Sequence, residues 1–143
     1  MKNIKTSYIL IGLAILIVGS LSLSKYLQAN DPNVASSGAF HWHPELTIYV
    51  KGQKQEIPAN IGMVGGHKPM HTHTEDASKG VVHLEFAGAA RNDEITLSRF
   101  FDTWGKDMQS FGSNVTMTVN GNPNTELGEY VFQDGDKIEL RYE

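Results

Sequence analysis

Residues 41–50 read HWHPELTIYV, and their pattern is the starting point for the fold class. The apolar side chains Trp42, Leu46, Ile48 and Val50 all occupy even positions, whereas histidine, glutamate, threonine and tyrosine occupy the odd ones. Because successive side chains of a strand point to opposite faces, this alternation predicts one half-buried β-strand over the whole stretch.

The chain that follows predicts two more strands separated by a long loop. Residues 51–54 are expected to turn, and residues 55–61 to return as the second strand of a hairpin, kept at an edge by Pro58. Residues 62–80 contain four glycines and form a loop of a length that is often functional. Residues 81–86 alternate again and predict a central strand.

A helix and three further extended segments complete the expected order. Residues 96–108 carry apolar side chains at helical spacing, with Thr96 as the expected N-cap. Residues 115–119, 130–132 and 137–142 are predicted to be extended. The order favours the α+β class: a mixed or antiparallel β-sheet packed by one helix.

The N-terminal segment predicts a membrane-directed helix. Lys2 and Lys5 precede an apolar stretch over residues 8–23. A signal peptide and an uncleaved anchor both remain open, and we favour the anchor because residues 27–29 make a poor cleavage site. The two lysines are expected to stay in the cytoplasm, which predicts a single-pass anchor and an extracytoplasmic C-terminal domain, periplasmic or at the cell surface.

Three parts of the chain follow from these patterns. We expect an anchor or signal segment at residues 1–25, a polar linker at residues 26–39, and a histidine-rich α+β domain at residues 40–143.

Composition excludes several classes of function. The formal net charge is -4, and no run of basic residues would follow a phosphate backbone, so no nucleic-acid partner is expected. The chain has no cysteine, which rules out disulfides, thiolate nucleophiles and cysteine-ligated metals.

The histidines form the most informative pattern. All six lie between positions 41 and 83. Two His-x-His pairs would each converge on one side of an extended segment, and a further histidine projects from the non-core face of its strand. Three or four converging imidazoles suit a first-row transition metal, so we predict a copper or zinc site with these ligands: His41, His43, His71, His73 and His83.

Other residues near these histidines have secondary roles in the prediction. Glu45 and Glu85 share the histidine face by parity and are candidates to orient the rings or to ligate the ion. Glu75 and Asp76 are further candidates. We expect His67 to be solvated, and Met63 and Met70 to be packing or loop residues rather than copper ligands.

Five segments of the chain resemble an uncharacterised family of small membrane-anchored or secreted proteins of bacteria and archaea. The resemblance lies in residues 41–48, 57–62, 70–73, 80–85 and 96–105, with the motifs HxH, HTH and VxH. Members often carry an aspartate directly after the HTH motif, where this chain has Thr74. The resemblance implies the domain limits and no activity. Separately, the last third of the chain resembles the final hairpin of β-grasp domains.

Three functions compete. We favour a metal-binding protein for capture, delivery or sensing over an enzyme. The first alternative is a hydrolase-type zinc enzyme in which Glu45 or Glu85 acts as general base. The second is a structural or adhesive module displayed by the membrane tether, and its histidines would be solvated or respond to pH.

Overall fold

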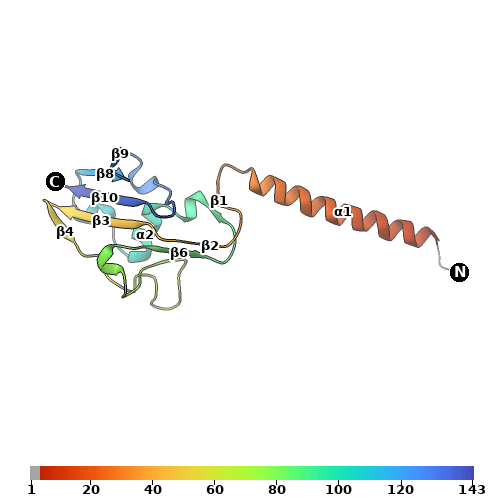
Figure 1. Ribbon diagram of the computed structural model, residues 1–143, viewed down its shortest axis with the longest axis horizontal. Helices are drawn as coiled ribbons and strands as arrows, with labels where there is room; N and C mark the ends of the chain where they lie inside the picture. The colour runs from red at the N-terminus through yellow and green to blue at the C-terminus, as the bar shows by residue number, and fades with distance from the viewer. Residues whose placement is uncertain (1–3) are drawn as a thin grey trace.

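The computed structural model describes residues 4–143 and consists of one long helix and a β-rich domain (Figure 1). Helix α1 (Ile4–Ala29) projects away from the domain. Over Ser7–Ala29 it is long and apolar enough to cross a membrane, a test that a signal sequence also passes. The side chains of this segment are exposed, as expected for a helix that meets lipid rather than a protein core.

A five-stranded mixed sheet forms one part of the domain. Its order is β4 (Gln53–Gln55), β3 (Glu45–Val50), β10 (Lys137–Tyr142), β8 (Val115–Val119) and β9 (Asn122–Asn124). Strand β10 runs parallel to β3, and the other pairs are antiparallel.

A three-stranded antiparallel sheet lies beside it. Strand β6 (His83–Phe86) is central, between β2 (Phe40–Trp42) and β5 (Met70–His71). A third, two-stranded sheet pairs β1 (Val34–Ser36) with β7 (Ala90–Arg91).

Helix α2 (Leu97–Trp104) begins and ends where local chemistry dictates. The Thr96 hydroxyl caps its N-terminus by accepting a hydrogen bond from the Arg99 amide, as predicted. Gly105 adopts a left-handed conformation and ends the helix, so the predicted extension to Met108 is wrong. Met108–Phe111 form a separate 3₁₀ turn, and the other 3₁₀ turns are Ala77–Lys79, Asn92–Glu94 and Leu127–Glu129.

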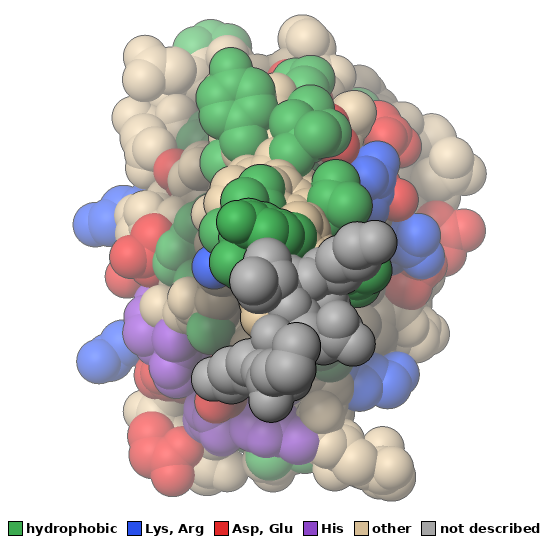
Figure 2. All heavy atoms as spheres, turned by 90° about the vertical axis from the view of Figure 1, so that its right-hand side faces the viewer, with side chains coloured by type: hydrophobic (Ala, Val, Ile, Leu, Met, Phe, Trp, Pro, Cys, Tyr) green, Lys and Arg blue, Asp and Glu red, His purple; other side chains and the backbone are tan. Residues whose placement is uncertain are grey.

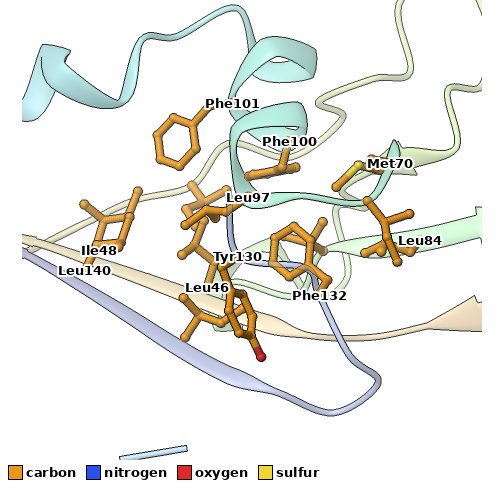
Figure 3. Close-up of a cluster of buried hydrophobic side chains, with 14 of the residues drawn as sticks. Leu46, Ile48, Met70, Leu84, Leu97, Phe100, Phe101, Tyr130, Phe132 and Leu140 are labelled. Atoms are coloured by element: carbon orange, nitrogen blue, oxygen red, sulfur yellow. The ribbon is translucent and has the colours of Figure 1, made fainter. Parts of the chain in front are cut away.

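The hydrophobic core lies between α2 and the sheets (Figure 3). Leu97 and Phe100 of α2 pack against Leu46 and Ile48 of β3 and Leu140 of β10, all completely buried. Met70 and Leu84 extend the same core under the three-stranded sheet. The predicted α+β class is therefore confirmed, while the likeness to β-grasp domains stays a prediction.

Two predicted strands are corrected. The stretch 41–50 is not one strand, because it breaks at His43 and the buried Pro44, and its two halves join different sheets. Proline has no amide hydrogen to continue a strand ladder. The returning strand covers only β4, before Ile57 and Pro58, and not residues 55–61.

The predicted linker is short and partly ordered. Helix α1 continues to Ala29, and β1 already pairs with β7. Asn92 adds two hydrogen bonds to the intervening chain, from its amide nitrogen to the Asn33 carbonyl at 2.9 Å and from its side chain to the Pro32 carbonyl at 3.0 Å. The β-rich domain is thus held close to the end of α1. The three-part division of the chain stays a prediction.

Candidate metal centre

One face of the three-stranded sheet carries the histidines. His41 lies opposite Glu85 on β6, and His71 lies opposite His83. Trp42 lies opposite Leu84, so the next pair in the same register is His43 with His83. Because residues that are directly opposite share a face, these histidines and Glu85 all project to one side, and Leu84 and Met70 enter the core on the other.

An extended segment holds His71 and His73 in place, as their predicted convergence required. The Thr72 side chain between them is buried: its hydroxyl donates to the Pro58 carbonyl at 2.8 Å and accepts from the Ile61 amide at 3.1 Å. Two backbone hydrogen bonds join the same segments, from Thr72 to Ile61 and from Asn60 to Thr72.

Gly62 permits the close approach of the loop to this segment. Its φ is +74°, and an added Cβ would lie 2.5 Å from the Met70 carbonyl oxygen and 3.2 Å from the His71 Cβ. The Lys68 amide then donates to the Gly62 carbonyl at 2.9 Å and closes the glycine-rich loop. This closure brings His67 back to the sheet.

Three histidines, His67, His71 and His73, form what we name the loop triad. The Nε2 atom of His71 lies 3.0 Å from Nε2 of His67 and 3.1 Å from Nε2 of His73. The Nδ1 atom of the buried His71 ring lies 2.9 Å from the Lys68 carbonyl oxygen, which can only accept a hydrogen bond. This bond places the proton on Nδ1 and leaves the Nε2 lone pair directed at the other two rings.

His41, His43 and His83 form the strand triad, built on the same plan. Nδ1 of the buried His83 lies 3.2 Å from Nε2 of His41. Its Nε2 donates to Asp76 Oδ2 at 2.9 Å, which leaves the lone pair on Nδ1. A carboxylate behind a ring in this way orients a metal-ligating histidine and raises its basicity. The other oxygen of Asp76, Oδ1, is buried and has no hydrogen-bond partner among the described residues.

The ligand nitrogens of each triad lie within 4.8 Å of one another, so each group could hold a metal ion. The two triads adjoin: the ring centroid of His83 is 4.5 Å from that of His73 and 5.4 Å from that of His71. Figure 2 shows histidine side chains gathered beside acidic ones on the side of the domain from which α1 extends.

Burial favours the neutral form of two of the rings. It lowers the pKa of His71 to about 4, and the neighbouring histidines add to the shift against the opposing hydrogen bond to Lys68. Burial also lowers the pKa of His43, and the neighbouring His41 and His83 lower it further. A neutral imidazole is the form that ligates a metal, so neither ring must lose a proton at neutral pH.

Glu85 lies between the two triads, and Glu45 does not. Glu85 shares the histidine face, and its Oε2 is 3.9 Å from Nε2 of His67. His41, His67 and Glu85 line a hollow of about 670 Å³ with apolar walls that include Phe40 and Phe86. Glu45 belongs to the five-stranded sheet, but a bridge to Val81 keeps it in the register of His41 and Glu85, so it retains the predicted parity. No contact between its carboxylate and a histidine is found among the described residues.

The structure brings all five predicted histidines to one place but divides them between two triads. His67, which we expected to be solvated, is half exposed and completes the loop triad. Of the acidic candidates, Asp76 contacts His83 and Glu75 is exposed to solvent. Met70 is a core residue, as predicted. The sequence feature that could have indicated a ligand role for His67 is its place after two consecutive glycines of the loop.

No known protein family, curated protein or solved structure matches the chain.

Proposed function

We propose that this protein binds copper or zinc outside the cytoplasm, at a membrane to which α1 anchors it. The observation that carries the proposal is the convergence of three Nε2 atoms in the loop triad. Nε2 of His71 lies 3.0 Å from that of His67 and 3.1 Å from that of His73. Ligands about 2.0–2.1 Å from one zinc ion in tetrahedral directions lie little more than about 3 Å from each other. The ligand nitrogens of the loop triad therefore have a spacing that suits one ion.

The ligand set restricts the ion. Six imidazoles with carboxylates nearby suit zinc and Cu(II), whereas Cu(I) prefers sulfur. Cysteine is absent, and the Met70 sulfur belongs to the core. Resident Cu(II) would colour the purified protein, whereas zinc, with its filled d shell, would leave it colourless.

The ordered tether supports capture or delivery near the bilayer. Only a few residues separate the end of α1 from strand β1, and the triads lie on the side of the domain from which α1 extends. The two lysines ahead of the apolar stretch favour export of the domain. An ion bound there would be held close to a transport protein in the same membrane.

Elemental analysis tests the proposal. We expect the full-length chain in detergent micelles to retain zinc or copper after desalting, and the melting temperature to rise with either ion because the ion binds only the folded state. The His67→Gln/His73→Gln variant keeps the buried His71 and should lose the ion of the loop triad. A wild-type chain that retains no ion and shows no shift in melting temperature contradicts the proposal. That result would favour the structural or adhesive module displayed by the membrane tether.

A hydrolase-type zinc enzyme is the second candidate, because each triad supplies three protein ligands. Catalytic zinc keeps a fourth position for water, whereas structural zinc has four protein ligands. The hollow beside Glu85 offers space for a substrate next to that position. Ester or phosphoester hydrolysis by the zinc-loaded chain, lost in Glu85→Gln with zinc still bound, would favour this function over simple binding.

A further inference from the structure

The two triads share one face of one sheet, and their relation suggests more than two separate sites. His83 of the strand triad is the cross-strand partner of His71 of the loop triad. The rings of His83 and His71 are stacked, with an interplanar angle of 15°. The ring centroid of His83 also lies 4.5 Å from that of His73, so ions bound in both triads would be neighbours.

Two neighbouring divalent cations repel each other, and anionic groups close to them offset this repulsion. The six imidazoles are neutral ligands and supply no compensating charge. Three carboxylates with described contacts lie close to the triads: Asp76 behind His83, Asp134 at the backbone amide of His43, and Glu85 beside His67. Among these, Glu85 is the one in contact with the loop triad.

Glu85 lies beside both triads. Its Oε2 lies 3.9 Å from Nε2 of His67, the nitrogen that faces His71 in the loop triad. On the next strand, Glu85 is directly opposite His41 of the strand triad, where side chains on one face have Cβ atoms about 4.5–5.5 Å apart. All three side chains line the same hollow. A carboxylate has two oxygens, so it can contact two ions at once.

We infer that the chain holds a two-ion centre, with one ion in each histidine triad and the Glu85 carboxylate as the ligand that both ions share. The inference rests on the proposed metal-binding function. It gives the half-exposed Glu85 side chain a defined role. It also explains why the sheet brings together six histidines where three would hold one ion.

Titration with Cu(II) tests the inference, because two copper ions joined by a carboxylate are magnetically coupled. We expect the full-length chain in detergent micelles to bind two Cu(II) ions per chain, with an electron paramagnetic resonance spectrum of coupled spins. Glu85→Gln removes the bridging charge without changing the size of the side chain. It should abolish the coupling and raise the weaker dissociation constant by about tenfold or more. Glu75→Gln, the same change at an exposed neighbouring site, should leave both properties unchanged.

Two paired variants assign the ions. His41→Gln/His43→Gln and His67→Gln/His73→Gln each keep the buried histidine of their triad and should each bind one uncoupled Cu(II) ion. One ion per wild-type chain overturns the inference and leaves the proposed function intact. Two uncoupled ions, or a Glu85→Gln spectrum identical to that of wild type, also overturn it. No bound ion at all contradicts the proposed function as well.

Discussion

The strand triad and the loop triad have the same plan but differ in the group that fixes the buried ring. In the strand triad that group is the Asp76 carboxylate, and in the loop triad it is the Lys68 backbone carbonyl. The carboxylate carries a negative charge that raises the basicity of His83 and attracts a cation, whereas the carbonyl only selects the tautomer of His71. Two similar ligand sets can therefore differ in affinity through groups that never touch the ion, and we expect the strand triad to fill first.

The triads also differ in what holds their ligands in place. Strand β6 carries His83, and its partner β2 carries His41 and leads directly into His43. The loop triad depends on the closed loop from Gly62 to Lys68 and on the buried Thr72. Changes in the loop should therefore damage one triad and spare the other.

The largest expected effect comes from Gly62→Ala. The new Cβ would meet the Met70 carbonyl at 2.5 Å, in a backbone conformation that already costs alanine about 1–2 kcal/mol. We expect a loss of about 3 kcal/mol in the free energy of unfolding, together with the ion of the loop triad. Urea denaturation and elemental analysis measure the two effects.

Gly65→Ala is the matched control. Gly65 has a similar φ of +78°, but an added Cβ meets no atom within 4 Å. It should cost only about 1–2 kcal/mol and keep both ions. Equal losses of stability in the two variants would show that the close approach at Gly62 is unimportant.

Acid should weaken the metal-free protein through His71. The pKa of this ring is about 4 in the folded state and 6.5 ordinarily. Between these two pH values the unfolded chain binds a proton that the folded chain does not bind. The stabilisation is complete above pH 6.5 and is lost as the pH falls toward 4, by about 3 kcal/mol.

Urea denaturation of the chelator-treated protein at several pH values measures this slope. The His71→Gln variant has no proton to take up at this position, so its stability should fall less steeply over the same interval, whatever its stability at neutral pH. Identical slopes for variant and wild type would show that His71 titrates in the folded protein as it does in the unfolded chain.

Asp76→Asn tests the difference between the triads directly. It removes the charge behind His83 and should weaken the ion of the strand triad by about 10- to 100-fold while leaving the loop triad unchanged. Calorimetric titration with zinc, with Glu75→Gln as the control of equal charge change, gives both affinities. An unchanged affinity for both ions would mean that the two triads do not differ as we describe.

The smallest expected effect comes from Thr72→Val. The change removes the hydroxyl that joins Pro58 and Ile61 and should destabilise the fold by about 1 kcal/mol, with a slight weakening of the loop triad only. Thr74→Val, at an exposed position, should change stability by less than about 0.5 kcal/mol. A larger cost at Thr74 than at Thr72 would contradict this picture of how the loop is supported.

The pattern of apolar and polar residues along a single segment predicted several strands and the helix that pack against the core. The alternation at residues 115–119 and 137–142 gave strands β8 and β10, and the helical stripe with its Thr96 cap gave α2. Parity also predicted that His41, His43 and His83 share one face with Glu85. These features depend on side-chain direction along a single element, which the sequence contains.

Features that depend on contacts between distant segments could not be predicted in this way. The chain passes from one sheet to another at Pro44, which divides the predicted single strand in two. His67 reaches its triad because the loop closes between Gly62 and Lys68, and Asp76 reaches His83 from a 3₁₀ turn. No periodicity marks such meetings, and for this reason the division into two triads emerged only from the structure.

The X-ray absorption spectrum of the zinc-loaded full-length chain shows whether the histidine triads bind the metal. It should show zinc ligated by nitrogen and oxygen alone, at about 2.0–2.1 Å, with the outer-shell scattering of about three imidazoles per ion. A spectrum without imidazole scattering, as for zinc held only by water and surface carboxylates, would contradict the claim that the histidine triads bind the metal.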